Sequence, residues 1–226
     1  MKNSAKKRGF DDACGMAHGL ELLGDRWALF VVRELMLGPR RFGDLRADLP
    51  GISANVLAQR LTELEANGIV VRGKLPPPAS VPVYGLSEWG YEAEPIVQEL
   101  GRWAARSPRH DPTLPISGVS ILLSFRTMID RKAIGDLVLA VGFRFGEDEY
   151  LGHLGADGFS VGRGAADAGD IVFVGTPSVL AGFVYGGAPL AELAESGALH
   201  LMGDPALAAR FAALFVLPPK FVPPPR

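Results

Sequence analysis

In the first third of the chain, apolar residues recur at helical spacing and are separated by turn residues. They predict a helix from Arg26 to about Leu37, with Asp25 as its N-cap and the pair Gly38-Pro39 as its stop. A second, shorter helix is predicted from Arg41 to Arg46, before the turn Pro50-Gly51. This part of the chain is therefore expected to consist of short helices joined by tight turns.

A third helix is predicted from Ala54 to about Ala66, with Ser53 as its N-cap. Leucines at i, i+4 and i+7 form the face that must pack on a core: Leu57, Leu61 and Leu64. About 200° away, at roughly 100° per residue, lies a polar stripe made of Asn55, Gln59 and Thr62. Asn and Gln suit bidentate contacts with adenine in the major groove, and a helix N-terminus suits a phosphate. The alternative interpretation is a stripe that is merely solvated.

The residues after this helix predict a β-hairpin. Ile69 to Arg72 is β-branched and apolar, Lys74 to Pro82 is a proline-rich excursion, and Val83 to Leu86 returns as a second strand. A hairpin with a long tip after such helices is a wing, so the segment is predicted to be a winged helix-turn-helix that binds double-stranded DNA. The residues expected to contact DNA are Arg41, Ser53, Asn55, Gln59, Arg60, Arg72 and Lys74.

A long helix with an apolar seam is predicted from Ser87 to about Arg106. Its apolar positions are spaced four, three, four and three residues apart, as in two packed helices: Trp89, Ala93, Ile96, Leu100 and Trp103. Pro95 interrupts the pattern and should kink the helix or remove one backbone bond. The seam can pack on its own domain or on a second subunit, and the small size of a winged helix favours the second subunit.

Composition and charge limit the remaining classes of protein. The chain has 226 residues, 48% of them apolar, and a formal net charge of −2. The first 106 residues hold 14 Lys and Arg against 13 Asp and Glu, and the remainder holds 9 against 12, so the small positive excess lies with the DNA-binding segment. The single cysteine allows no internal disulfide, which fits a cytoplasmic protein. We expect no signal peptide and no transmembrane helix, because no apolar run is long enough.

The motifs of common enzymes are missing. Gly118-Val119-Ser120 lacks the closing glycine of a nucleophile elbow, and Gly162-Arg163-Gly164 lacks the third glycine of a dinucleotide fingerprint. With one cysteine and scattered histidines, no metal site is expected. His153 and His200 could lie near each other on a sheet, where such a pair is more often structural. We therefore expect neither an enzyme nor a bound cofactor.

Ordered blocks in roughly the first 105 residues resemble the HxlR family of bacterial winged-helix regulators. These blocks are Cys14, Leu22-Leu23-Gly24-Asp25-Arg26-Trp27, Arg41-Phe42 to Leu45-Arg46, Ile52-Ser53 to Leu57, Leu61 to Leu64, Gly68-Ile69-Val70, Tyr84 to Ser87 and Trp103. The resemblance implies a homodimer, paired through its first and last helices, on a pseudo-palindromic site. The expected interface residues are Met16, Leu20, Trp89, Ile96, Leu100 and Trp103.

Cys14 lies at the start of a short helix predicted up to Leu23. A helix N-terminus lowers the pKa of a thiol, and some HxlR relatives sense oxidants or electrophiles through a cysteine near this place. The family commonly has Pro after this cysteine, where this chain has Gly15. Cys14 is thus a candidate redox sensor, and the alternative is a small buried apolar residue, which is how free cysteine usually behaves.

A proline-rich segment, Ser107 to Pro115, is predicted to be a stiff linker between two domains. The expected order is a disordered basic arm at 1–13, a DNA-binding and dimerisation domain at 14–106, the linker at 107–115, a second domain at 116–217 and a proline-rich tail at 218–226. Helix and strand patterns in the second domain predict an α+β layer, with strands near 137–145, 150–154, 158–161, 170–174 and 198–202.

The second domain resembles the sterol carrier protein-like fold over roughly the last hundred residues. The residues that carry this resemblance are Asp170-Ile171-Val172-Phe173, the helix at 176–183, Gly186 to Leu193, Ser196-Gly197-Ala198-Leu199 and Gly203-Asp204 to Phe215. The resemblance implies an apolar tunnel or a dimer contact. The residues expected to line a pocket for an apolar effector are Phe125, Met128, Phe143, Phe173 and Phe183, although core packing is the default for each ring.

Together these patterns predict an α+β protein, a winged helix-turn-helix domain followed by a sterol carrier protein-like domain. The expected function is that of a dimeric DNA-binding transcriptional regulator whose second domain binds an apolar effector or aids dimerisation. The alternative is a lipid or small-molecule carrier with an ancillary helix-turn-helix module. Salt-dependent binding to duplex DNA would separate the two.

Overall fold

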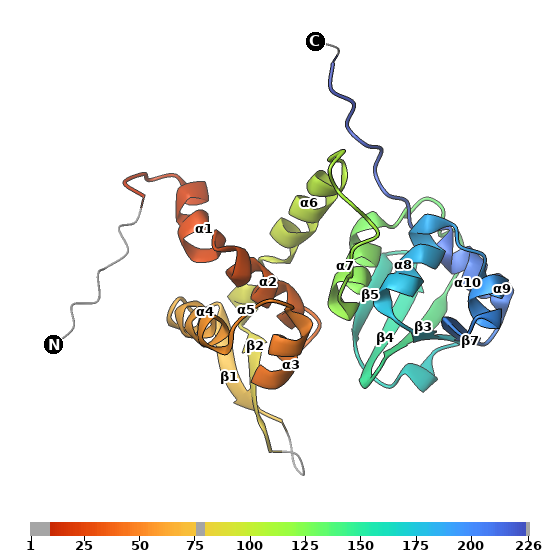
Figure 1. The fold of residues 1–226 in the computed structure, drawn as a ribbon, viewed down its shortest axis with the longest axis horizontal. Coiled ribbons are helices and arrows are strands. Elements are labelled where there is room, and N and C mark those ends of the chain that lie inside the picture. The colour runs from red at the N-terminus through yellow and green to blue at the C-terminus, as the bar shows by residue number, and fades with distance from the viewer. Residues whose placement is uncertain (1–9, 76–79, 225–226) are drawn as a thin grey trace. The chain divides into compact units, whose positions relative to one another are not determined.

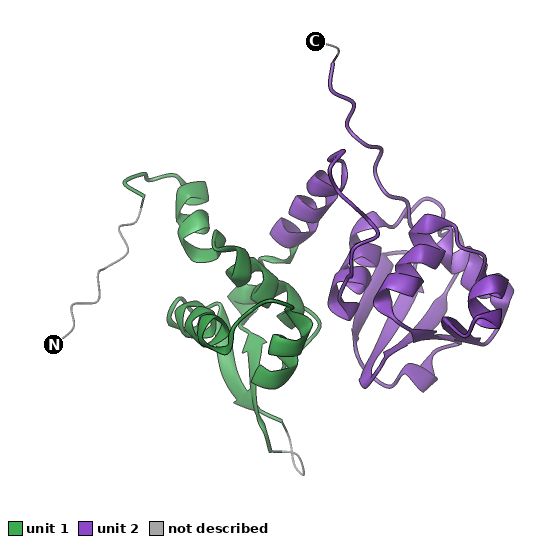
Figure 2. Cartoon of the chain, viewed as in Figure 1, with its two compact units in different colours: residues 1–94 green, residues 95–226 purple. Residues whose placement is uncertain are grey.

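The computed structural model describes residues 10–75 and 80–224. The chain forms two compact units, residues 1–94 and 95–226 (Figure 2). This division falls within the long helix predicted from Ser87 to about Arg106, whereas the sequence places the boundary at the proline-rich linker. The basic arm predicted at 1–13 lies mostly outside the described residues.

The first unit contains helices and one hairpin in the predicted order (Figure 1). Its elements are α1 (Gly15–Leu23), α2 (Arg26–Leu35), α3 (Phe42–Asp48), α4 (Ala54–Ala66), β1 (Val70–Lys74), β2 (Pro82–Leu86) and α5 (Glu88–Tyr91). Two helix starts are fixed by the predicted caps. The Asp25 carboxylate accepts a hydrogen bond from the Trp27 N–H at 2.9 Å, and the Ser53 hydroxyl accepts one from the Val56 N–H at 3.2 Å.

The core of the first unit lies between α2, α3 and α4. Its fully buried side chains include Val31, Val32, Leu35, Leu45, Leu57, Leu61 and Leu64. The leucine stripe of α4 therefore packs inward as predicted. Burial of apolar side chains of this size typically contributes about 1.5–3 kcal/mol each, so this stripe decides which face of α4 remains at the surface.

The wing has a third backbone partner that the sequence does not reveal. β1 and β2 pair antiparallel, with Arg72 opposite Tyr84. The backbone N–H of Arg40 donates to the Tyr84 carbonyl and the Tyr84 N–H donates back to the Arg40 carbonyl, both at 2.8 Å. The residue that follows the Gly38-Pro39 turn thus extends the hairpin and fastens it to the chain before α3.

The predicted long helix is interrupted where Pro95 enters it. α5 ends at Tyr91, and α6 runs over Glu94–Ala105. Pro95 is the second residue of α6, where its missing N–H removes no intrahelical bond. Gly90 fixes α5 against the wing, because a Cβ there would lie 2.3 Å from the Ile69 carbonyl oxygen.

The second unit is a mixed sheet with helices, and its α+β content agrees with the prediction (Figure 1). After α6 come α7 (Gly118–Met128), β3 (Leu139–Phe145), β4 (Asp148–Gly155), β5 (Gly158–Arg163), the 3-10 helix η1 (Ala166–Ala168), β6 (Ile171–Gly175), α8 (Pro177–Gly186), α9 (Leu190–Glu195), β7 (Leu199–Met202) and α10 (Pro205–Ala212). The five strands are ordered β5-β4-β3-β6-β7. β3 pairs in parallel with β6, and the other pairs are antiparallel.

One face of this sheet is buried under α7, α8 and α10. Phe125 of α7 and Phe211 of α10 both contact Phe143 of β3, with ring centroids 6.1 Å apart in each pair. The opposite face carries η1 where the backbone approaches closely. A Cβ at Gly142 would lie 2.0 Å from the Ala166 carbonyl oxygen, so only glycine fits at this position.

Candidate DNA-binding surface

The outer face of α4 carries the polar stripe that the sequence places there. Asn55, Gln59 and Thr62 are exposed, whereas Leu57 and Leu61 on the opposite face are buried. Among the described residues, no protein group bonds the Asn55 side chain. Its amide therefore keeps both of its donors and its acceptor for a ligand.

Two residues of the stripe have partners within α4. The Gln59 amide donates to the Glu63 carboxylate at 3.0 Å, and the Thr62 hydroxyl donates to the Ala58 carbonyl at 2.9 Å. The Thr62 bond is the back-bond to residue i−4 that threonine makes within helices. Gln59 must therefore exchange Glu63 for a base edge in order to contact DNA, whereas Asn55 has no such exchange to make.

Arg60 lies on the inner side of α4. Its guanidinium is 2.8 Å from Glu63 and 3.5 Å from Asp25, and its side chain is only 11% exposed. This arrangement joins α4 to the N-terminus of α2. Arg60 is thus paired within the chain, and the DNA contact expected of it from the sequence stays a prediction.

The wing carries an oriented arginine. The Arg72 guanidinium is 2.9 Å from Glu65 of α4 and lies 5.4 Å from the centre of the Tyr84 ring. Arg72 and Lys74 are both exposed on β1. Tyr84 and Glu65 thus hold an exposed cation beside α4, and Lys74 follows it two residues further along the same strand.

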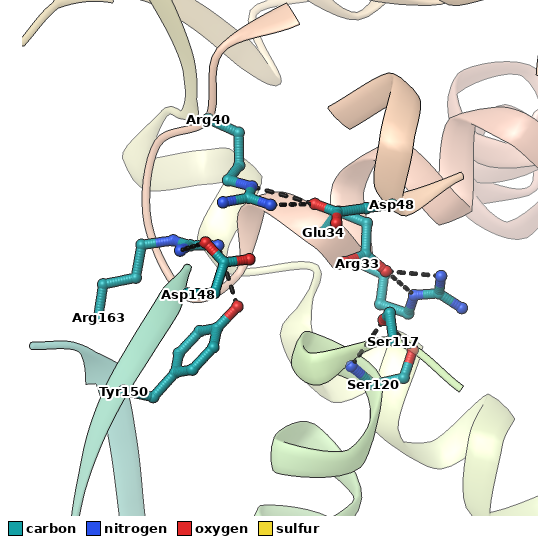
Figure 3. A network of polar contacts seen from close by, with 9 residues as sticks. All are labelled: Arg33, Glu34, Arg40, Asp48, Ser117, Ser120, Asp148, Tyr150 and Arg163. Atoms are coloured by element: carbon teal, nitrogen blue, oxygen red, sulfur yellow. Dashed lines mark hydrogen bonds and ion pairs between the residues drawn. The ribbon is translucent and has the colours of Figure 1, made fainter. Parts of the chain in front are cut away.

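Three further arginines on and before α3 divide into exposed and buried ones. Arg41 and Arg46 are exposed at the two ends of α3. Arg40 is only 7% exposed and forms an ion pair with Asp48, its Nε lying 3.1 Å from the carboxylate (Figure 3). Arg40 is therefore structural, and Arg41 and Arg46 carry exposed charge at the ends of α3.

The contacts of Glu63 and Glu65 are the functional detail that sequence reasoning missed. Glu63 stands four residues after Gln59 and three after Arg60, which is the spacing of side-chain pairs on one helix. Counting those spacings along α4 predicts the Gln59 and Arg60 contacts with Glu63. The contact from Glu65 to Arg72 spans the turn into β1, so no helical spacing predicts it.

The residues expected at a dimer interface are exposed in the chain. They comprise Met16 and Leu20 on α1, Trp89 on α5, and Ile96, Leu100 and Trp103 on α6. Trp103 is 72% exposed and Met16 71%. A contiguous exposed apolar patch is typical of a surface that another molecule covers, and pairing through these residues stays a prediction.

Cys14 is exposed and precedes α1 as its N-cap residue. Its backbone N–H donates to the Asp12 carboxylate at 2.9 Å. The alternative of a buried apolar residue is therefore wrong within this chain, because its side chain is accessible. Its reactivity stays a prediction.

The aromatic residues assigned to a ligand pocket form the core of the second unit. Phe125, Phe143 and Phe173 are fully buried, and Phe143 and Phe173 stack with their ring centroids 5.9 Å apart. The rings of Phe183 and Phe173 lie with their centroids 5.9 Å apart. Met128 is also buried, with 9% of its surface exposed. An apolar ligand would thus have to separate rings that already pack against one another.

Polar pairs lie beside this core. The Arg163 guanidinium is 2.9 Å from the Asp148 carboxylate and donates to the Tyr150 hydroxyl at 3.1 Å (Figure 3). Burial raises the pKa of Tyr185, and its bond with the Ser124 hydroxyl at 2.6 Å opposes that effect only in part. Tyr185 therefore stays protonated, as expected of a structural hydroxyl.

The histidine pair considered from the sequence is not brought together. His153 lies on β4 and His200 on β7, and β3 and β6 separate those strands. Within residues 10–75 and 80–224, no group of three or more His, Cys, Asp or Glu is arranged to hold a metal ion. No helix in the described part of the chain is both long and apolar enough to span a bilayer.

Comparison with known proteins identifies the family to which the amino-terminal part of the chain is similar. The family described as HxlR-like helix-turn-helix matches residues 22–111. The HTH-type transcriptional regulator YodB of Bacillus subtilis (strain 168) is 40% identical over 89 residues, which are 39% of this chain and 80% of YodB. The HTH-type transcriptional regulator YvaP of the same organism is 36% identical over 85 residues, which are 38% of this chain and 79% of YvaP.

Solved structures of YodB cover a similar share of the chain. The reduced form of YodB from B. subtilis aligns at 36% identity and a TM-score of 0.39, over 44% of this chain and 100% of that one. The quinone-bound form of YodB aligns at 38% identity and a TM-score of 0.35, over 39% of this chain and 93% of that one. Because YodB is matched over four fifths of its length at 40% identity, the chain belongs to the HxlR-like helix-turn-helix family of transcriptional regulators.

Proposed function

We propose that this regulator binds a pseudo-palindromic operator as a homodimer, with α4 of each subunit in the major groove and the wing beside the backbone. The observation that carries the proposal is the outer face of α4, where Asn55 is exposed with its amide unpartnered and Gln59 and Thr62 extend the same stripe. Asn and Gln amides discriminate adenine, and a good bidentate pair contributes about 1–3 kcal/mol of discrimination.

Positive charge around α4 supports the same assignment. Arg41 and Arg46 lie at the ends of α3, and Arg72 and Lys74 are exposed on β1. These side chains would neutralise phosphates on either side of the groove, and Ser53 at the start of α4 offers a helix N-terminus to another phosphate. Arg60 is left out of this set because Asp25 and Glu63 already pair with it.

Pairing through α1 and α6 would give the molecule two recognition helices. The support is the exposure of Met16 and Leu20 on α1 and of Ile96, Leu100 and Trp103 on α6. A two-fold dimer binds half-sites about one helical turn apart, roughly 10 base pairs centre to centre. An operator recovered by this protein should therefore be an inverted repeat.

The test begins with selection of bound duplexes from a random-sequence pool by the purified protein. An inverted repeat is expected, and its affinity should fall steeply with salt. Asn55→Ala and Gln59→Ala should each weaken this site about 5- to 150-fold, equivalent to roughly 1–3 kcal/mol, with little effect on random DNA. Asn67→Ala, at the far end of α4, is the matched control. If both variants bind the selected site as tightly as the parent, α4 does not contact the bases.

For the second unit we propose a role in dimerisation or in binding an apolar effector, on a sterol carrier protein-like fold. The order of strands and helices supports this fold, and the aromatic rings supply an apolar interior. Because Phe125, Phe143 and Phe173 pack on one another, an effector must separate these rings to bind. An effector that binds the folded protein should raise its melting temperature. A thermal-shift panel of fatty acids and aromatic metabolites, followed by operator titration with each hit, tests the effector role.

A further inference from the structure

After α10 the chain runs back along the second unit to the carboxyl end of α6 (Figure 1). Leu214 accepts a hydrogen bond from the Asp130 N–H at 2.7 Å, and the Val216 N–H donates to the Met128 carbonyl at 3.1 Å. Ile129 and Phe215 form a bridge between these bonds. We call residues 214–221 the strap, and its first half is thus fastened to the end of α7.

The second half of the strap ends on α6. The Lys220 ammonium donates to the carbonyls of Ala105 at 3.0 Å, Ser107 at 3.1 Å and His110 at 3.2 Å, and it lies 3.3 Å from Nδ1 of His110. The last carbonyls of a helix have no intrahelical partner and carry partial negative charge. An ammonium with three donors therefore fits this position as a C-terminal cap.

Further bonds join the same parts of the chain. The Phe221 N–H donates to the Arg106 carbonyl at 2.7 Å, and Arg106 Nε donates to the Pro219 carbonyl at 3.4 Å. The Arg102 guanidinium donates to the Thr127 carbonyl at the end of α7. The carboxyl half of α6 is thus held by the strap and by α7, while its other end follows the break before Pro95.

We propose that the strap is a clamp that makes α6 a part of the second unit and so links pairing through α6 to the state of that unit. The proposal rests on the proposed dimerisation through α6. Ligand binding or unfolding that loosens the strap would free the end of α6 and weaken pairing. The second unit would thereby act on DNA binding through the dimer. An effector can change the affinity for DNA only if it binds two states of the protein unequally.

The first measurement compares hydrogen exchange in full-length Lys220→Met and in the parent chain. Met keeps the apolar stem and removes the three donors. Exchange of the amides of Arg106, Ser107 and His110 should become about five-fold faster, as expected for the loss of a typical net hydrogen-bond contribution. Lys132→Met is the matched control, because Lys132 is exposed in the same unit and its ammonium makes no hydrogen bond or ion pair within the described residues. Unchanged exchange in Lys220→Met overturns the clamp.

The second measurement is the dimer dissociation constant of the same proteins by sedimentation, with Trp103→Ala alongside. The proposal expects Lys220→Met to weaken the dimer and Lys132→Met to leave it unchanged. If Trp103→Ala weakens the dimer and Lys220→Met does not, the link to pairing is refuted. If Trp103→Ala leaves the dimer intact, the proposed interface on α6 fails instead, and the clamp is then judged by hydrogen exchange alone.

Discussion

Asp25 offers a sharp test of how α2 and α4 are held together. Its carboxylate has two partners, the Trp27 N–H at 2.9 Å and the Arg60 guanidinium at 3.5 Å. The first contact caps α2, and the second joins α2 to the recognition helix. Asp25→Ala removes both contacts, whereas Asp25→Asn keeps a capping oxygen and removes the charge.

The two contacts predict different magnitudes. Loss of an N-cap typically costs about 1 kcal/mol, and Asn caps as well as Asp. The ion pair is long and the Asp25 side chain is 37% exposed, so screening limits its contribution to about 0.5 kcal/mol. Asp25→Ala should therefore destabilise the first unit by about 1.5 kcal/mol, and Asp25→Asn by about 0.5 kcal/mol. For a unit of this size, the larger change lowers the midpoint by about 6–12 °C.

Thermal unfolding followed by tryptophan fluorescence measures both variants, because Trp27 and Trp89 lie in the first unit. The melting temperature should fall in the order parent, Asp25→Asn, Asp25→Ala. Equal losses in the two variants would mean that the charge alone matters and that the cap does not stabilise α2. No loss in either variant would refute both contributions.

Three further predictions concern other parts of the molecule. Trp103→Ala should raise the dimer dissociation constant in sedimentation runs about 30-fold or more, the loss expected of a central interface tryptophan, while the exposed Val138→Ala should leave it unchanged. If Cys14 is a sensor, diamide or a quinone should weaken operator binding by the parent and not by Cys14→Ser, and non-reducing gels distinguish an adduct from an intersubunit disulfide. The hydrogen bond from the Ala166 N–H, and then that from Arg144, lower the pKa of the Glu149 carboxyl. The stability that this carboxylate gives the folded protein is therefore present above its ordinary pKa of 4.5 and is lost as the pH falls through the lowered pKa. Glu149→Gln should therefore lower the melting temperature near pH 7 and match the parent in acid; an equal difference at both pH values contradicts this.

The positions of single helices could be predicted because caps and apolar repeats lie close together in the sequence. Thr176 caps α8 before Pro177 at the first helical position, and Asp204 caps α10 in the same manner, as the sequence indicates. The recognition helix was predictable for the same reason, since its cap and leucine repeat lie within fourteen consecutive residues. Periodicity thus identifies which face of α4 is exposed.

Contacts between distant segments could not be predicted, because periodicity carries no information about partners. The parallel pairing of β3 with β6 skips two intervening strands. Lys220 reaches the carbonyl of Ala105 across more than a hundred residues. Pro95 predicts a kink or the loss of one backbone bond within a single helix, whereas the structure divides this stretch into α5 and α6.

The position of Arg40 has a consequence for the choice of DNA site. Its backbone pairs with Tyr84 of the wing, and its side chain holds Asp48 at the end of α3, just before α4 begins. These contacts of Arg40 therefore fix the distance between the wing and the proposed recognition helix α4. A duplex must match that distance or deform to fit it, and the energy of deforming DNA depends on its base sequence. This regulator should accordingly discriminate between operators by groove width, even at base pairs that no side chain contacts.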